Sequence, residues 1–273
     1  MSITTTDSAT KQSQGNAITP EDVQNASVVA SEAVARYALS LADDALILAQ
    51  RLGQWVSRAP EMEEDIALTN IALDLVGHAR FFYSYAGTAW GKTEDDLAYF
   101  RDEEEFLSAR IVEQDNGDFG QTIARQLIFS YYQHGLYTAM LDSSDETLRA
   151  VAAKALKEVE YHVDHASQWL LRLGLGTEES NRRMQAGLDF MWAYMNELFE
   201  DLELHEDPAA VKPSTLRETC LAQLTHIIER AGLKVPETKQ ARSGQRTGCF
   251  SEHRGYILTE MQVLARRHPG ATW

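Results

Sequence analysis

The chain has 273 residues, of which 44% are hydrophobic and 24% are charged, and these values are ordinary for a globular protein with a buried core. Its formal net charge of −16 argues against nucleic acid or an anionic membrane surface as a partner. The two cysteines, Cys220 and Cys249, form neither a metal-binding motif nor a disulfide framework, so we expect a cytoplasmic protein. No apolar run approaches the roughly 20 residues that a membrane-spanning helix requires.

The N-terminal residues are polar and lack the basic start and the apolar centre of a signal peptide. We expect a disordered tail over residues 1–26 and one helical domain over residues 27–273. Thr19-Pro20 has the pattern of an N-cap followed by a proline at the first helical position. A helix that starts there, either unbroken or with one break, is predicted to end near Pro60.

Helical periodicity dominates the chain and strand alternation is absent, which predicts an all-α fold. Four long helices are expected to form a ferritin-like bundle, with additional C-terminal helices packed around it. After the first helix, the bundle helices are predicted at about Glu61 to Tyr85, Phe119 to Leu141 and Glu146 to Leu173. A fifth helix is predicted from Glu178 to about Leu204, and two more begin at Pro213-Ser214 and after Ser251-Glu252.

Two histidines occupy corresponding places on the second and fourth of these helices. Ferritin-like di-iron bundles use Glu-x-x-His on two helices and a single Glu from each of two others. Here the residue three before His78 is Leu75, and the residue three before His162 is Val159. Because leucine and valine have no donor atom, the two decisive carboxylate positions cannot bind iron.

The other two long helices offer little to replace these ligands. Asp43 or Asp44 is a candidate for the carboxylate of the first helix. The third helix has no acidic residue between Asp118 and Asp142, and its only imidazole is His134. Three of the four expected carboxylates are missing, so the sequence predicts a dismantled metal site. We therefore predict no catalytic, cofactor-binding or metal-binding residue in this chain.

A different spacing keeps one metal-binding alternative open. Asp74 precedes His78 by four residues, Glu158 precedes His162 by four, and this spacing also places two side chains on one helix face. A single metal held by these four residues, with His165 as a further imidazole, is the alternative. The interpretation we favour is that Asp74, Glu158 or an acid of the first helix hydrogen-bonds to the buried histidines without metal.

The connection before the last helix is basic, although the chain as a whole is acidic. Such a run of charge is usually a solvated surface, and the alternative is contact with an acidic partner or a phosphate. The basic residues are Lys234, Lys239, Arg242, Arg246 and Arg254.

From about Tyr37 to Trp273, the sequence resembles the structural, non-catalytic subunits of bacterial phenylacetyl-CoA epoxidases, a family of multicomponent ferritin-like monooxygenases. The segments that carry the resemblance are LAQRLGQWVSRAPEMEEDIALTNIALDLVGHAR, LAYFRDEEEF, VEQDNGDFGQTIARQ, KALKEVEYHVDHASQWLLRLGLGT and TEMQVLARRHPGATW. Each segment is long and their order is preserved, which makes a chance match improbable.

The resemblance implies a division of labour between subunits. A catalytic A subunit of similar fold carries the di-iron site and binds the CoA thioester, and the chain studied here pairs with it. A small B subunit bridges such pairs, and a reductase with flavin and an iron–sulfur cluster delivers electrons from NADPH. The resemblance thus implies no cofactor in this chain. Besides a structural subunit and a metal-binding protein, a third hypothesis is an unrelated all-α interaction protein whose histidines are ordinary core residues.

Overall fold

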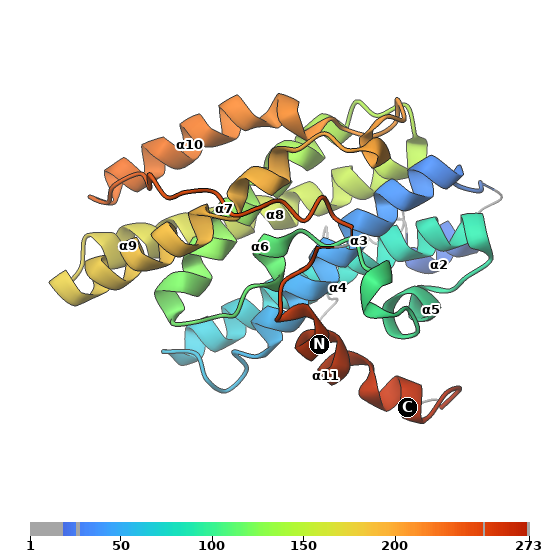
Figure 1. Ribbon diagram of the computed structural model, residues 1–273, viewed down its shortest axis with the longest axis horizontal. Helices are drawn as coiled ribbons and strands as arrows, with labels where there is room; N and C mark the ends of the chain where they lie inside the picture. Colours follow the sequence, from blue (N-terminus) through green and yellow to red (C-terminus); the bar gives the residue numbers. More distant parts are fainter. Residues whose placement is uncertain (1–18, 26–27, 248, 272–273) are drawn as a thin grey trace, which may run out of the picture.

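The computed structural model describes residues 19–25, 28–247 and 249–271. Within these residues the structure is helical and contains no strand, which confirms the predicted all-α fold. Figure 1 shows the long helices running along the longest axis, with α10 (Arg217–Arg230) along one side and α11 (Arg254–Arg267) on the opposite side. No helix in the described part of the chain has the length and apolar character needed to cross a bilayer.

Four helices form the predicted ferritin-like bundle. They are α3 (Glu32–Gly53), α4 (Met62–Trp90), α7 (Phe119–Met140) and α8 (Glu146–Gly174). Helix α3 packs along α4, α7 packs along α8, and α4 meets α8, so that each helix buries an apolar stripe against its neighbours.

Side-chain caps fix where three of these helices, α3, α7 and α8, begin. Ser31 accepts a hydrogen bond from the Val34 N–H at the start of α3, and Asp145 accepts one from the Leu148 N–H at the start of α8. Such caps satisfy backbone N–H groups that have no partner within the helix. Helix α4 ends at Gly91, whose φ of 62° is the left-handed conformation that favours glycine.

The predicted tail, residues 1–26, lies outside the described residues up to residue 18. The helix predicted to start at Thr19-Pro20 is confirmed as the short helix α2 (Pro20–Asn25), which is separate from α3. Several other predicted boundaries were wrong. The helix predicted to end near Pro60 ends at Gly53. Helix α4 continues to Trp90, five residues past the predicted end.

The fifth predicted helix is shorter than expected. Helix α9 spans Glu178–Trp192, and a 3₁₀ helix, η2 (Met195–Phe199), follows it. Glu197, Leu198 and Phe199 are all buried, and three consecutive buried residues do not fit one face of a surface α-helix. The tighter 3₁₀ turn brings this segment into the core.

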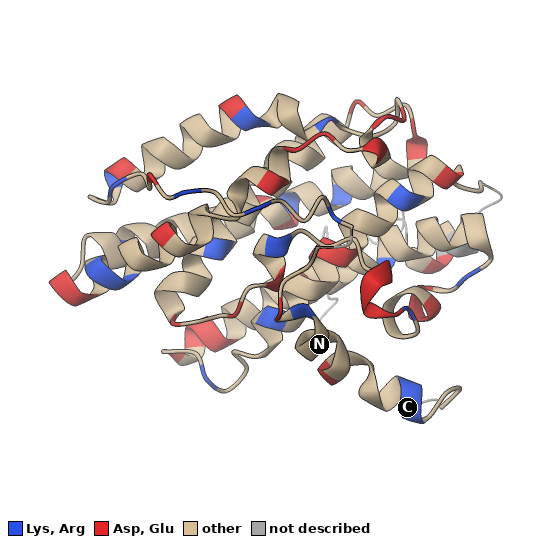
Figure 2. Ribbon diagram, in the orientation of Figure 1, with Lys and Arg blue, Asp and Glu red and all other residues tan. Residues whose placement is uncertain are grey.

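The connection between α4 and α7 contains α5 (Glu94–Tyr99), η1 (Glu103–Glu105) and α6 (Arg110–Glu113). Figure 2 shows acidic residues gathered on α5 and η1. The part of this connection that follows η1 is buried, because Phe106, Ile111 and Val112 have no exposed surface. The connection therefore lies in the core and brings polar groups close to α3.

Candidate functional site: a histidine–carboxylate ladder between two bundle helices

Three histidine–carboxylate pairs join α4 to α8, and we call them the ladder. The Nε2 atoms of the histidines lie 2.7 to 3.0 Å from the carboxylate oxygens. Each pair takes one residue from α4 and one from α8, in the order expected of antiparallel helices. The pairs are Glu64 with His165, Asp74 with His162, and His78 with Glu158.

The pairs of His78 and His162 confirm that Asp74 and Glu158 hold the buried histidines, but the pairing is crossed. His78 on α4 bonds to Glu158 on α8, whereas Asp74 on α4 bonds to His162 on α8. The spacing of four residues placed each acid on the same face as the histidine of its own helix. In the structure each acid instead reaches the histidine of the neighbouring helix, so the bonds hold the two helices together.

Each ladder bond gives the Nε2 atom of a buried imidazole a hydrogen-bond partner. His78 and His162 are each only 2% exposed. An ionised carboxylate only accepts hydrogen bonds, so the Nε2–H group of the histidine is the donor in each pair. Burial lowers the pKa of His162, and the hydrogen bond to Asp74 opposes that shift.

The pair of Glu64 and His165 was not predicted. His165 lies three residues after His162 and therefore on the same face of α8, which is a signal that the sequence contained. Glu64 lies in the first turn of α4, where acids are common because of the helix dipole, so its role in the ladder was not evident.

The donor set near the ladder does not fit a metal centre. Leu75 and Val159 are buried at the two positions where carboxylates are needed. Nδ1 of His78 is buried and has no hydrogen-bond partner among the described residues, but one imidazole nitrogen does not hold an iron ion. Among the described residues, no three His, Cys, Asp or Glu side chains gather closely enough to bind a metal.

The interior side of His78 faces α7, which supplies no carboxylate. The ring of Tyr137 meets the His78 ring edge-on, with the centroids 5.6 Å apart. Gln133 Nε2 donates to the Tyr137 hydroxyl at 3.1 Å. The group of α7 that meets His78 is therefore a phenol ring held by an amide, and neither group is a carboxylate.

The candidate acids of the first helix are used for buried ion pairs. Asp43 pairs with Arg101 and accepts a hydrogen bond from the Tyr83 hydroxyl at 2.6 Å. Asp44 lies 2.8 Å from Arg246 and accepts a bond from the Ala109 N–H at 2.7 Å. Neither Asp43 nor Asp44 bonds to a ladder histidine.

Two residues of the basic connection are buried, although a run of charged residues usually lies on the solvated surface. Arg246 and Arg254 are buried, at 4% and 2% exposure. Arg246 pairs with Asp44, and Arg254 lies 3.4 Å from Glu113. The acidic groups that these arginines meet are therefore within the chain itself, and the C-terminal segment is held against the bundle by charge.

A buried carboxyl, Glu197, lies beside this network. Its Oε2 accepts a long hydrogen bond of 3.2 Å from the Arg110 N–H, and its Oε1 has no hydrogen-bond partner. Burial raises the pKa of Glu197 to about 7, and the nearby guanidinium of Arg246 only partly opposes this shift.

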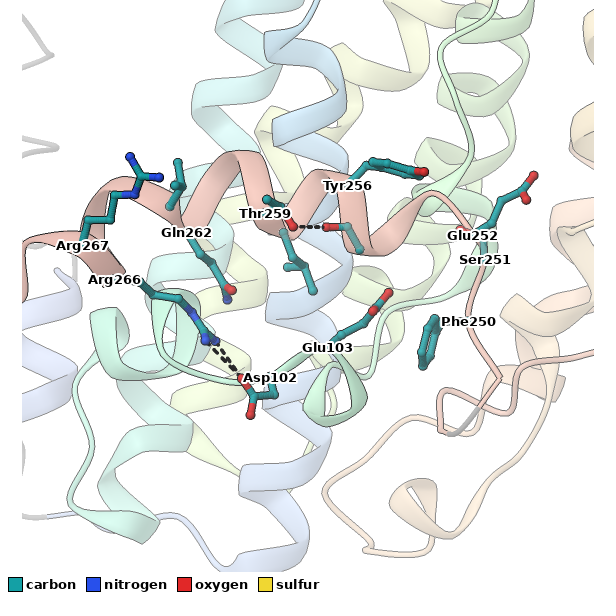
Figure 3. Close-up of a pocket in the computed structure, with 13 residues that line it drawn as sticks. Asp102, Glu103, Phe250, Ser251, Glu252, Tyr256, Thr259, Gln262, Arg266 and Arg267 are labelled. Atoms are coloured by element: carbon teal, nitrogen blue, oxygen red, sulfur yellow. Dashed lines mark hydrogen bonds and ion pairs between the residues drawn. The ribbon is translucent and has the colours of Figure 1, made fainter.

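A wide groove elsewhere on the molecule shares no residue with the ladder. Figure 3 shows this groove between α11 and the residues Asp102 and Glu103, with Arg266 turned toward Asp102. Its volume is about 660 Å³, and the Arg266 guanidinium lies 3.1 Å from the Asp102 carboxylate. The lining contains carboxylate and hydroxyl side chains but neither histidine nor cysteine.

Loss of a ladder acid should destabilise the fold. Replacing Asp74 or Glu158 by Ala leaves a buried imidazole N–H without an acceptor, and we expect each change to cost about 1–3 kcal/mol of unfolding free energy. Asp74→Asn, which keeps an acceptor oxygen, should recover part of the loss. Chemical denaturation of both variants, with the exposed Asp164→Ala on α8 as a control, measures this effect. Unfolding curves identical to the parent would contradict the ladder's role.

Comparisons with known proteins place the chain in a family. Residues 11–273 match the family model described as "Phenylacetic acid catabolic protein". The chain is also 44% identical over 242 residues to the C subunit of the 1,2-phenylacetyl-CoA epoxidase of Escherichia coli strain K12. That match covers 87% of this chain and 98% of the relative. The chain therefore belongs to the phenylacetic acid catabolic protein family.

Proposed function

We propose that this chain is a structural, catalytically silent subunit of a phenylacetyl-CoA epoxidase. The observation that carries the proposal is the ladder. At the two Glu-x-x-His positions, Leu75 and Val159 replace the acids, and both histidines are bonded to carboxylates of the neighbouring helix. The bundle thus keeps its form by hydrogen bonds where a catalytic relative would need metal ligands. The choice of enzyme rests on the similarity to a subunit of a phenylacetyl-CoA epoxidase.

In this proposal the chain acts by association. It pairs with and stabilises a catalytic A subunit that contains the di-iron site, and a B subunit bridges such pairs. A reductase subunit with flavin and an iron–sulfur cluster supplies electrons from NADPH. The reaction is epoxidation of the aromatic ring of phenylacetyl-CoA. The residues of this chain contribute a rigid helical surface rather than a reacting group.

The competing proposal is a catalytic metalloprotein that uses Asp74, His78, Glu158 and His162. It requires each histidine to exchange its carboxylate hydrogen bond for a metal. The side-chain geometry favours the structural role, because these carboxylates already satisfy the imidazole N–H groups. The third hypothesis, an unrelated interaction protein, does not agree with the family match over residues 11–273.

Iron content tests the structural role. We expect the purified chain to contain no stoichiometric iron, because three of the four carboxylates of the bundle pattern are missing. Elemental analysis of the chain, with a catalytic subunit purified in the same way as the positive control, measures this. About two irons per chain, as in a di-iron bundle, would rule out the structural role.

Restoring the two acids should not restore activity. The double variant Leu75→Glu with Val159→Glu still lacks a carboxylate on α7, and each new acid enters a buried apolar site that raises its pKa. We therefore expect no epoxide from this variant and the reductase when the A subunit is omitted. Circular dichroism should first establish that the variant is folded. Epoxide formation by the folded variant would show that the ligand assignment is wrong.

A further inference from the structure

The outward side of α4 carries a second apolar stripe. Met62, Ile66, Thr69, Leu73 and Val76 follow one another in steps of four, three, four and three residues. The exposed fractions of Met62, Ile66 and Leu73 are 77%, 57% and 62%. Because the inward stripe of α4 is already buried in the bundle, this helix is apolar on two sides, whereas a surface helix is normally apolar on one.

The same stretch of α4 is nearly free of charge. Between Ile66 and Ala79 the only Asp, Glu, Lys or Arg is Asp74, although the chain has a net charge of −16. Depletion of charged residues at the centre of an exposed apolar area is typical of the core of a protein–protein interface. Charged residues lie at the borders instead, and acids predominate among them. Glu61, Glu63 and Asp65 lie at the start of the stripe, where Glu61 is 3.6 Å from Arg172. On α8, Lys154 and Glu158 lie beside Leu73.

Gly77 adds an independent observation. A glycine within a helix costs about 1 kcal/mol relative to alanine. Among the described residues, no atom lies within 4 Å of a Cβ built at Gly77, so no contact within that part of the chain requires a glycine. A hollow of about 120 Å³ opens beside it between α4 and α8. A side chain from a neighbouring helix fits such a hollow, as a knob fits a hole between packed helices.

Tyr161 extends this apolar area onto α8. Its side chain is 47% exposed, and its ring lies beside those of His162 and His165, with centroids 6.4 and 6.1 Å away. Tyrosine is enriched among the residues that contribute most to binding energy at interfaces. The ladder therefore lies directly beneath an exposed aromatic side chain and holds α8 in register with α4.

We propose that this surface binds a helix of a different subunit, and we call it the α4 face. It consists of Met62, Ile66, Leu73, Val76, Gly77 and Tyr161. The exposed apolar residues of α4 follow at steps of three and four residues and so form a straight line along the helix. Such a line packs against another helix better than against a strand or a loop. The partner helix carries apolar residues at the same spacing and basic residues on its flanks, opposite the acids at the border.

A second copy of this chain is disfavoured as the occupant. Two copies would each carry a net charge of −16 and would bring the same acidic border together. The inference rests on the proposed function, which identifies the partner as the catalytic subunit of the epoxidase.

The test compares charge insertion at two equally exposed leucines. Leu73→Asp places a charge in the α4 face, and Leu175→Asp places one at a similarly exposed site beyond α8, at 65% exposure. We expect Leu73→Asp to weaken binding to the purified catalytic subunit at least 100-fold and Leu175→Asp to change it less than threefold. Gly77→Trp should also block binding without loss of fold, because the site is open, whereas Gly77→Ala should melt at or above the parent temperature.

Three outcomes separate the inference from the proposed function. If the parent chain does not bind the catalytic subunit, the proposed function fails. If the parent and Leu73→Asp bind equally well while both are folded, the α4 face is not the docking surface and the proposed function survives. If the chain alone forms a dimer that Leu73→Asp dissociates, the occupant is a second copy and the inference is overturned.

Discussion

Replacing Arg246 by Met should destabilise the protein by about 3–5 kcal/mol at pH 8, which is the usual cost of removing one partner from a buried ion pair. The Arg246 and Asp44 side chains are each 3% exposed, and their charged atoms lie 2.8 Å apart. Without the guanidinium, Asp44 would remain as an isolated charge in the core. Burial already raises the pKa of Asp44, so the carboxyl would take up a proton in the variant as the pH falls.

The loss should therefore be smaller at pH 5 than at pH 8, because a protonated Asp44 avoids the cost of a buried charge. Chemical denaturation at both pH values measures this difference. Arg242→Met, at an exposed position of the same connection, is the matched control and should change stability by less than about 0.5 kcal/mol. The double variant Asp44→Asn with Arg246→Met should recover part of the loss. Equal stability of Arg246→Met and Arg242→Met would contradict the role of the pair.

Glu197→Gln should stabilise the protein at high pH. The pKa of Glu197 is raised to about 7 in the fold, so the folded state holds a proton that the unfolded state releases near pH 4.5. The unfolding free energy contributed by this carboxyl is therefore highest below pH 4.5 and is lost as the pH rises to about 7. The difference between a pKa of about 7 in the folded state and 4.5 in the unfolded state corresponds to about 3 kcal/mol of unfolding free energy.

Glutamine resembles the protonated carboxyl at all pH values. The variant should match the parent near pH 4.5 and exceed its unfolding free energy by about 3 kcal/mol at pH 8. Burial lowers the pKa of His205 to about 4, so this residue makes the unfolding free energy rise with pH over a similar range. The contribution of His205 is the same in variant and parent, and it cancels when the two are compared at each pH. Glu203→Gln, at an exposed position, is the control. A stability difference that does not depend on pH would contradict the raised pKa.

The bundle and the burial of Leu75, His78, Val159 and His162 were predictable because both depend on local periodicity. Leu75 and His78 lie on one apolar stripe, and so do Val159 and His162, so helical spacing alone places all four inside the bundle. The absence of an acid in the third helix is likewise read directly from the sequence.

The contacts of the buried charged groups were less predictable, because they join distant segments. Asp44 and Arg246 are about 200 residues apart in the chain, and the sequence contains no signal for their pairing. The crossed bonds of the ladder depend on the register between α4 and α8, whereas spacing within one helix defines only the face on which a side chain lies. The end of α9 at Trp192 depends on burial of the following segment in the core rather than on a helix-breaking residue.

Turnover of phenylacetyl-CoA by the reconstituted epoxidase tests the structural role most directly. The catalytic, bridging and reductase subunits are assayed for NADPH-dependent epoxide formation with increasing amounts of this chain. We predict almost no turnover without the chain and a rise that saturates when the chain matches the catalytic subunit in amount. We also predict no turnover when the catalytic subunit is the component left out. Equal turnover with and without this chain would contradict its role as a structural subunit.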